Sequence, residues 1–190
     1  MIRTLRCFAV AGLAVGYAYA GVGGRPVHAR SLVMDLVAGH KPLVGKAGAA
    51  VTVVGFIDYQ CPSCRAHFGD VERRVAQMPN ASLYVLQMPL PSHPIAAPAA
   101  TVALEAAERG EFPQVHKALL AGKELTWASL NGVAKRFGLS VRGDAGIRQE
   151  LAAEKKAFLD LKLSFVPVFV ISDSGSTQAY GWREALGRLK

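Results

Sequence analysis

Cysteine is scarce in this sequence of 190 residues, which contains only Cys7, Cys61 and Cys64. Three cysteines cannot cross-link a chain of this length into a disulfide scaffold. The chain does not need one, because 51% of its residues are hydrophobic and a domain of this size buries a sizeable core. The same apolar content excludes an intrinsically disordered protein.

Long blocks of basic residues are absent, although 22 Lys and Arg outnumber 14 Asp and Glu and give a formal net charge of +8. The bases occur as dispersed doublets such as Arg73-Arg74 and Lys135-Arg136, which are typical of solvated helix faces. We therefore expect no binding to nucleic acid. The net charge is compatible with a weak attraction to anionic membrane surfaces or acidic substrates.

A long hydrophobic run occurs only at the N-terminus. Arg3 and Arg6 precede it, and Ala18-Tyr19-Ala20 supplies a small-x-small cleavage pattern. These features predict a signal peptide over residues 1–20 and a periplasmic or otherwise extracytoplasmic location. The alternative is an uncleaved membrane anchor, because apolar and glycine residues continue to Gly24. Several glycines within the run weaken a spanning helix, so cleavage is favoured.

Residues 21–44 are interpreted as a lead-in segment with at most one edge strand, and residues 45–190 as one domain. The segment 51–57 is β-branched and almost wholly apolar, which predicts a strand covered on both faces. After Pro62, apolar residues recur at steps of four and three, as on the buried face of a helix; they are Cys64, Phe68, Val71, Val75 and Met78. A second strand follows at 83–88, so the two strands should form a parallel pair with a right-handed crossover.

The segment from about 92 to 163 has helical patterns throughout and predicts an inserted helical subdomain. Its third helix should end at Gly138 in a left-handed cap. A strand at 165–171, a hairpin partner at 178–181 and a helix at 182–190 complete the domain. The predicted fold class is therefore α/β, a sheet with an inserted helical subdomain.

The motif Cys61-Pro62-Ser63-Cys64 lies where the first strand meets the first helix. Residues three apart on a helix are neighbours, so the two sulfurs can form a disulfide. The partial positive charge and free N–H groups of the helix N-terminus stabilise a thiolate and lower the pKa of Cys61. Cys64 lies on the apolar stripe. We therefore expect an exposed nucleophile at Cys61 and a buried resolving thiol at Cys64.

Three other roles for these cysteines are weaker. A structural disulfide across four residues would stabilise the fold by only about 2 kcal/mol, against roughly 4.7 kcal/mol for a loop of about 100 residues. A zinc site needs four ligands, and only His67 lies near the pair in sequence, since His93 and His116 have no partner at ligand spacing. Covalent haem attachment requires His where the chain has Arg65. No metal is expected at this motif.

Three segments in this order resemble the DsbA-like thiol:disulfide oxidoreductases of the thioredoxin superfamily. They are residues 56–64 (FIDYQCPSC), 88–94 (MPLPSHP, leading into alanine-rich helices) and 165–169 (FVPVF). The resemblance covers about residues 45–185. It implies a thioredoxin-like fold with the helical insertion at about 92–163.

The resemblance also implies roles for residues around the cysteines. Pro167 corresponds to the family's cis-proline beside the redox pair, and backbone groups of Val166 would pair with an extended substrate peptide. Valine before this proline is similar to the oxidase branch, whereas isomerases more often have threonine. Pro62 and Ser63 would tune the redox potential. Because Ser63 replaces the histidine of the best-studied oxidase, we expect a weaker oxidant than that protein, though a stronger one than thioredoxin.

An acidic residue near the motif has two interpretations. Related domains often carry a buried acid where this chain has Gly55. Asp58 is nearer to the cysteines and is a candidate for proton transfer. The alternative role for Asp58 is a solvated or capping carboxylate at the end of the strand.

Together these features predict an exported oxidoreductase that introduces disulfides into reduced or unfolded exported proteins through Cys61 and Cys64. The disulfide itself carries two electrons, so no metal or organic cofactor is expected. Reoxidation would require a DsbB-like membrane partner or small-molecule oxidants, and we expect a monomer. The alternatives are a disulfide reductase or isomerase, and a non-catalytic metal-binding or chaperone-like module that uses the same cysteines.

Overall fold

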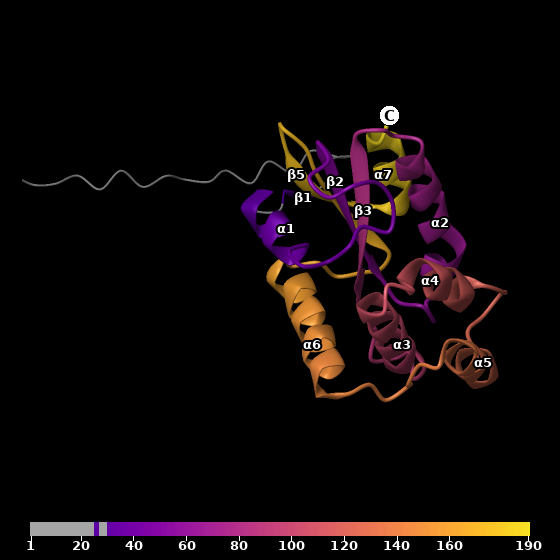
Figure 1. Ribbon diagram of the computed structural model, residues 1–190. Helices are drawn as coiled ribbons and strands as arrows, with labels where there is room; N and C mark the ends of the chain where they lie inside the picture. The colour runs from indigo at the N-terminus through magenta and orange to yellow at the C-terminus, as the bar shows by residue number, and fades with distance from the viewer. Residues whose placement is uncertain (1–24, 27–29) are drawn as a thin grey trace, which may run out of the picture.

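A five-stranded sheet in the order β1-β5-β4-β2-β3 forms the centre of the molecule (Figure 1). The parallel pair consists of β2 (Val51–Ile57) and β3 (Ala81–Gln87). On the other side of β2, β4 (Val168–Ser172) runs antiparallel to it and pairs with β5 (Thr177–Gly181). The short strand β1 (Arg25–Pro26) borders β5. The predicted parallel pair and C-terminal hairpin are therefore confirmed.

This computed structural model describes residues 25–26 and 30–190. The predicted signal peptide at 1–20 and most of the lead-in segment before residue 30 lie outside the described residues. Within the described ranges, none of the helices combines the length and the apolar character needed to cross a bilayer.

The sheet is covered by helices on both faces. Figure 1 shows α2 (Pro62–Ala76) and α7 (Trp182–Arg188) on one side, with α1 (Arg30–Leu36) and α6 (Ala145–Asp160) on the other. Every residue of β3, and every residue of β2 except the partly covered Val51, is buried. This double coverage explains the continuous apolar sequence of the central strands.

The segment between β3 and β4 is helical, as the sequence predicts. It comprises α3 (Ala96–Glu108), α4 (Phe112–Leu120), α5 (Trp127–Phe137) and α6. At the start of α5, the side chains and backbone N–H groups of Thr126 and Ser129 form a reciprocal capping box. The helix ends at Gly138 in the left-handed conformation, with φ of 64°, which confirms the predicted cap.

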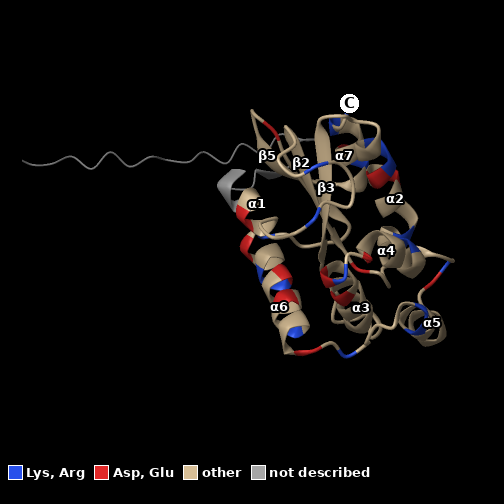
Figure 2. Cartoon of the chain, viewed as in Figure 1, with Lys and Arg blue, Asp and Glu red and all other residues tan. Residues whose placement is uncertain are grey.

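Charged residues are dispersed over the helices. Figure 2 shows acidic and basic residues interspersed along α2 and α6. The doublet Arg73-Arg74 lies in the last turn of α2, and Lys135-Arg136 in the last turn of α5. Basic side chains at these places interact favourably with the negative end of each helix dipole.

Two regions differ most from the sequence prediction. The lead-in segment contains α1, in which Val33 is buried in the core, and Val37 directly after this helix is buried as well. The four-residue spacing of these two valines is too short a pattern to predict a helix on its own. The strand predicted from residue 165 begins only at Val168, because Pro167 has no N–H to donate to a neighbouring strand.

Arg65 fastens the helical insertion to the first turns of α2. Its guanidinium donates hydrogen bonds to carbonyl oxygens at the C-terminal end of α4, namely those of Leu119 at 2.8 Å, Ala121 at 2.7 Å and Gly122 at 3.1 Å. It also donates to the carbonyl oxygen of Tyr59 at 2.9 Å. A cation is favoured at a helix C-terminus, where carbonyl groups lack partners within the helix.

We expect Arg65→Ala to lower the free energy of unfolding by about 2–3 kcal/mol, since it removes several charge-assisted hydrogen bonds. Arg65→Lys should lose part of this stabilisation, because a lysine ammonium group cannot bind the same set of carbonyl oxygens at once. The matched control is Arg73→Ala on the same helix, whose exposed pair with Asp70 should contribute less than about 1 kcal/mol. Urea denaturation measures all three variants. Equal losses for Arg65→Ala and Arg73→Ala would contradict the assignment.

Candidate active site

The two cysteines of the motif occupy the start of α2. Cys61 is the N-cap residue in an extended conformation, and Pro62 takes the first helical position, where its missing N–H costs nothing. Both thiols are free. Cys64 is completely buried, as predicted, whereas Cys61 is only 9% exposed. Cys61 is therefore the more accessible sulfur, but it is largely covered rather than openly exposed.

The surroundings of the two sulfurs separate their acidities. A hydrogen bond from the thiol of Cys64 is the largest influence on Cys61, and backbone N–H groups of Cys64 and Ser63 add to it. Together they lower the pKa of Cys61 to about 6 against the opposing effect of burial. Burial and the interaction with Cys61 raise the pKa of Cys64 far above its ordinary value. At neutral pH the charge of the pair therefore resides on Cys61.

The carboxylate of Asp58 binds the backbone at the start of the cysteine motif. One carboxylate oxygen accepts hydrogen bonds from the backbone N–H groups of Gln60 at 2.7 Å and Cys61 at 3.0 Å. The other accepts one from the N–H of Leu90 at 2.8 Å and lies 2.7 Å from Nδ1 of His93. Asp58 is 1% exposed, so it is a buried capping carboxylate and not a solvated one. Its predicted part in proton transfer stays a prediction.

The sequence analysis missed the partnership of His93 with Asp58. The two residues are 35 positions apart, so no local spacing links them. They meet because β2 and β3 are parallel neighbours whose C-terminal ends share one edge of the sheet. The side chain of His93 is 22% exposed, and Asp58 is fully covered beneath it.

A second missed residue, His116 on α4, lies deep in the core. Its Nδ1 is 2.8 Å from the hydroxyl oxygen of Tyr59, and burial lowers its pKa to about 4. Burial also raises the pKa of Tyr59 well above its usual range. The pair is therefore neutral at physiological pH. The signal for its burial was the spacing of four from Phe112, which places His116 near the apolar stripe of α4.

Gly55 leaves no room for the buried acid of related domains. A Cβ atom at this position would lie 2.8 Å from the ring of Phe68 and 3.0 Å from the ring of Phe169. Such contacts are far inside van der Waals distance, so the two aromatic rings already fill the space. Cys64 belongs to the same buried apolar cluster as these two rings, and its burial is the largest cause of its raised pKa.

The loop before β4 lies beside the cysteines. The Val166–Pro167 peptide bond is cis, and the carbonyl oxygen of Val166 lies 3.9 Å from Sγ of Cys61. The family resemblance implied that Pro167 lies beside the redox pair and that Val166 offers backbone groups there, and the structure places the loop that carries them next to Cys61.

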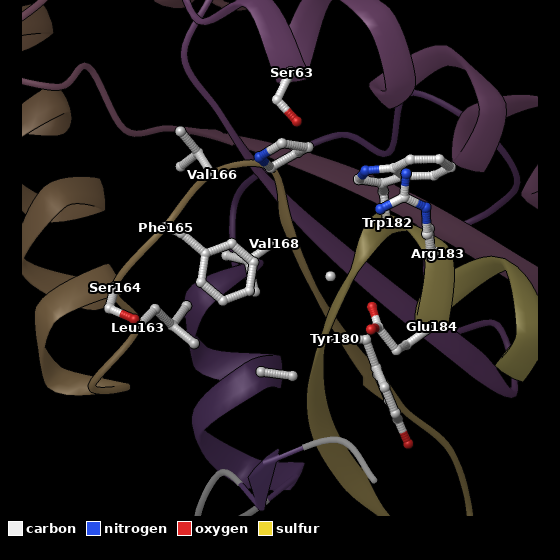
Figure 3. Close-up of a pocket in the computed structure, with 13 residues that line it drawn as sticks. Ser63, Leu163, Ser164, Phe165, Val166, Val168, Tyr180, Trp182, Arg183 and Glu184 are labelled. Atoms are coloured by element: carbon white, nitrogen blue, oxygen red, sulfur yellow. The ribbon is translucent and has the colours of Figure 1, made fainter. Parts of the chain in front are cut away.

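A groove of about 500 Å³ adjoins this loop. Figure 3 shows Phe165 and Trp182 on opposite sides of the groove, with Ser63 at its upper end. Phe165 is 49% exposed and so presents an apolar ring to the groove. His67 does not face the cysteine pair; its ring stacks on Trp182 with centroids 3.7 Å apart and supports that wall of the groove.

We expect the thiol of Cys61 in the reduced protein to titrate with a pKa of about 6. Cys64→Ala should raise this pKa towards its ordinary value, because it removes the hydrogen bond that contributes most. The ultraviolet absorbance of the thiolate, followed against pH in a Cys7→Ser background, measures both. An unchanged midpoint in Cys64→Ala would show that the pairing of the sulfurs does not set the acidity.

Comparison with known proteins agrees with this geometry. The family model described as thioredoxin matches residues 38–185. A thioredoxin-like oxidoreductase from Silicibacter pomeroyi DSS-3 superposes with a TM-score of 0.65 and 22% identity, over 84% of this chain and 96% of that one. The catalytic domain of Proteus mirabilis ScsC superposes with a TM-score of 0.64 and 19% identity, over 82% of this chain and 97% of that one. Pseudomonas aeruginosa DsbA2 superposes with a TM-score of 0.56 and 20% identity, over 72% of this chain and 82% of that one.

One relative found by sequence similarity belongs to a different class of protein. The Na(+)/H(+) antiporter NhaA 1 of Salinispora arenicola is 35% identical over 99 residues, which are 51% of this chain but only 15% of the antiporter. A match to so small a part of that protein assigns no ion transport to this chain. The family match and the solved structures confirm the predicted thioredoxin-like fold with its helical insertion. With Cys61 and Cys64 at the start of α2 and Pro167 beside them, the chain belongs to the thioredoxin family.

Proposed function

We propose that this protein is an exported thiol:disulfide oxidoreductase that introduces disulfides into substrate proteins through Cys61 and Cys64. The observation that carries the proposal is the placement of the two sulfurs at the start of α2, with Cys64 completely buried and Sγ of Cys61 3.9 Å from the carbonyl oxygen of Val166. This placement lowers the pKa of Cys61 to about 6 and raises that of Cys64. A stable thiolate on Cys61 favours the dithiol form, and so makes the disulfide form a better oxidant.

The reaction runs through a mixed disulfide. A substrate thiolate attacks Sγ of Cys61 in the oxidised protein, and the Cys61–Cys64 bond breaks, so that Cys64 leaves with the electron pair and takes up a proton. A second substrate thiolate then attacks the substrate sulfur of the mixed disulfide. Cys61 departs as a thiolate, which its low pKa makes a good leaving group. The substrate loses two electrons and the protein becomes the dithiol, without metal or organic cofactor.

Substrate binding is assigned to the loop and groove beside the cysteines. Backbone groups of Val166 would pair with an extended substrate segment, as in the addition of a strand to a sheet edge. The exposed ring of Phe165 offers apolar contact to unfolded or reduced proteins. Pro167, Pro62 and Ser63 shape and tune the site, and Asp58 positions the N–H of Cys61.

The location and partners follow from the same proposal. The predicted signal peptide would export the chain to the periplasm, and a solved structure with the same fold is a periplasmic thioredoxin-like protein from Salmonella enterica serovar Typhimurium. In that compartment a DsbB-like membrane protein would restore the disulfide. We propose that the protein acts as a monomer.

The direct test is oxidation of a reduced model protein. We expect Cys61→Ser to abolish it, because the attacked sulfur is lost, and Cys64→Ser to abolish it as well, because no Cys61–Cys64 disulfide can form to accept the two electrons. Cys7→Ser in the full chain is the matched control and should retain full activity. Tight stoichiometric binding of copper or zinc by the reduced thiols, with no turnover, would instead support the metal-binding alternative.

The redox potential tests the direction of exchange. In glutathione buffers we expect a redox potential between about −270 mV, the potential of thioredoxin, and about −120 mV, the potential of DsbA, after which the DsbA-like family is named. Ser63→His should move the potential upward, because a histidine at this position adds stabilisation of the Cys61 thiolate. A potential equal to that of thioredoxin would favour the reductase or isomerase alternative.

A further inference from the structure

A second cluster of ionisable side chains lies across the sheet from the cysteines. Glu150 and Glu154 are one turn apart on α6, and His40 follows α1 (Figure 1). Nδ1 of His40 lies 4.0 Å from an oxygen of Glu150 and 4.0 Å from Oε1 of Glu154. The three atoms all lie within 4.8 Å of one another. Disulfide exchange makes no use of this cluster.

Glu154 is the unexpected member, because it is buried with an unused oxygen. It is 4% exposed, and its Oε2 accepts a hydrogen bond from the backbone N–H of Gln87 at 2.6 Å. Its Oε1 is buried and has no hydrogen-bond partner in the part of the chain that the structure describes. That oxygen faces His40. Burying a carboxylate costs several kcal/mol unless a partner compensates, so an orphan oxygen here points to a missing cation.

The described side chains supply no lysine or arginine to these carboxyl groups. Among the side chains of residues 33–190, the ion pairs of Glu150 and Glu154 are with His40 alone. Two carboxyl groups and one imidazole therefore converge, and none of the described side chains brings a permanent positive charge to them.

We propose that His40, Glu150 and Glu154 form a binding site for a divalent transition-metal ion, represented by Zn²⁺. Imidazole nitrogen and carboxylate oxygen are both common zinc ligands, whereas Ca²⁺ and Mg²⁺ prefer oxygen alone. Three protein ligands leave the fourth tetrahedral position for water. The ion would balance the buried charge of Glu154 and join the loop after α1 to α6.

Binding of a zinc ion requires the three ligand atoms to move closer together. Zinc bonds of about 2.0–2.1 Å place neighbouring tetrahedral ligand atoms roughly 3.4 Å apart. The two separations of 4.0 Å from His40 must therefore shrink by roughly half an ångström, and the separation of the two glutamate oxygens, which is at most 4.8 Å, by no more than about 1.4 Å. His40 can supply the first shift, because it lies in a loop and its side chain is 24% exposed, and a rotation of the Glu150 side chain, which is 33% exposed, can supply the second. The two glutamates are held on one face of α6 by their spacing of four residues.

Isothermal titration of the oxidised full chain with zinc chloride tests the site. The Cys61–Cys64 disulfide prevents the redox pair from binding the metal, and Cys7→Ser removes the remaining thiol. We expect one equivalent of zinc to bind and to raise the Tm. His40→Gln and Glu150→Gln should each weaken binding by roughly tenfold or more, since loss of even an outer-shell partner costs about that much.

Glu124→Gln is the matched control, because it removes an exposed carboxylate from the loop between α4 and α5. It should bind zinc as the parent chain does. Absence of saturable one-to-one binding, or equal binding by the parent and His40→Gln, would overturn the proposal. Neither result bears on disulfide exchange, and His40→Gln should oxidise the model substrate at the parent rate.

Discussion

The carboxylate of Asp58 is the constraint on which the active-site geometry depends. It stands at the C-terminal end of β2 and binds, through its two oxygens, the start of α2 and the loop that follows β3. The end of β2, the start of α2 and the loop after β3, which lies 32 residues further along the chain, are thereby fixed to one buried group. Because the N–H of Cys61 is among its partners, the direction in which the motif leaves the sheet is set before any redox chemistry occurs. His93 closes the arrangement from the solvent side.

The environment of the motif then gives the two sulfurs opposite shifts in pKa. Phe68 and Phe169 occupy the volume next to Gly55, so Cys64 rests on an apolar core and strongly resists ionisation. Cys61 instead receives hydrogen bonds from Cys64 and from the first turn of α2. The same helix therefore stabilises charge at its first residue and excludes it one turn later. The largest causes of this asymmetry are the hydrogen bond between the two sulfurs and the burial of Cys64, and the side chain of Ser63 adds no charge to them.

Much of this arrangement could be predicted from the sequence, because it depends on local patterns. The apolar run of β2, the four-and-three spacing of α2, the left-handed cap at Gly138 and the position of the cysteine pair all follow from neighbouring residues. The contacts of Asp58 with His93 could not be predicted in this way, since parallel strand pairing brings the two together. Helix α1 was missed because two valines are too few to establish a helical period.

Arg65 also limits how the motif itself can change. The residue directly after the second cysteine carries the guanidinium that binds the terminal carbonyls of α4. A histidine there would complete the sequence pattern of covalent haem attachment, but its ring has neither the length nor the five donors of arginine. One substitution would thus remove the hydrogen bonds that join the helical insertion to α2 at the moment it created the haem motif. In this chain that sequence pattern would therefore come with a loss of stability.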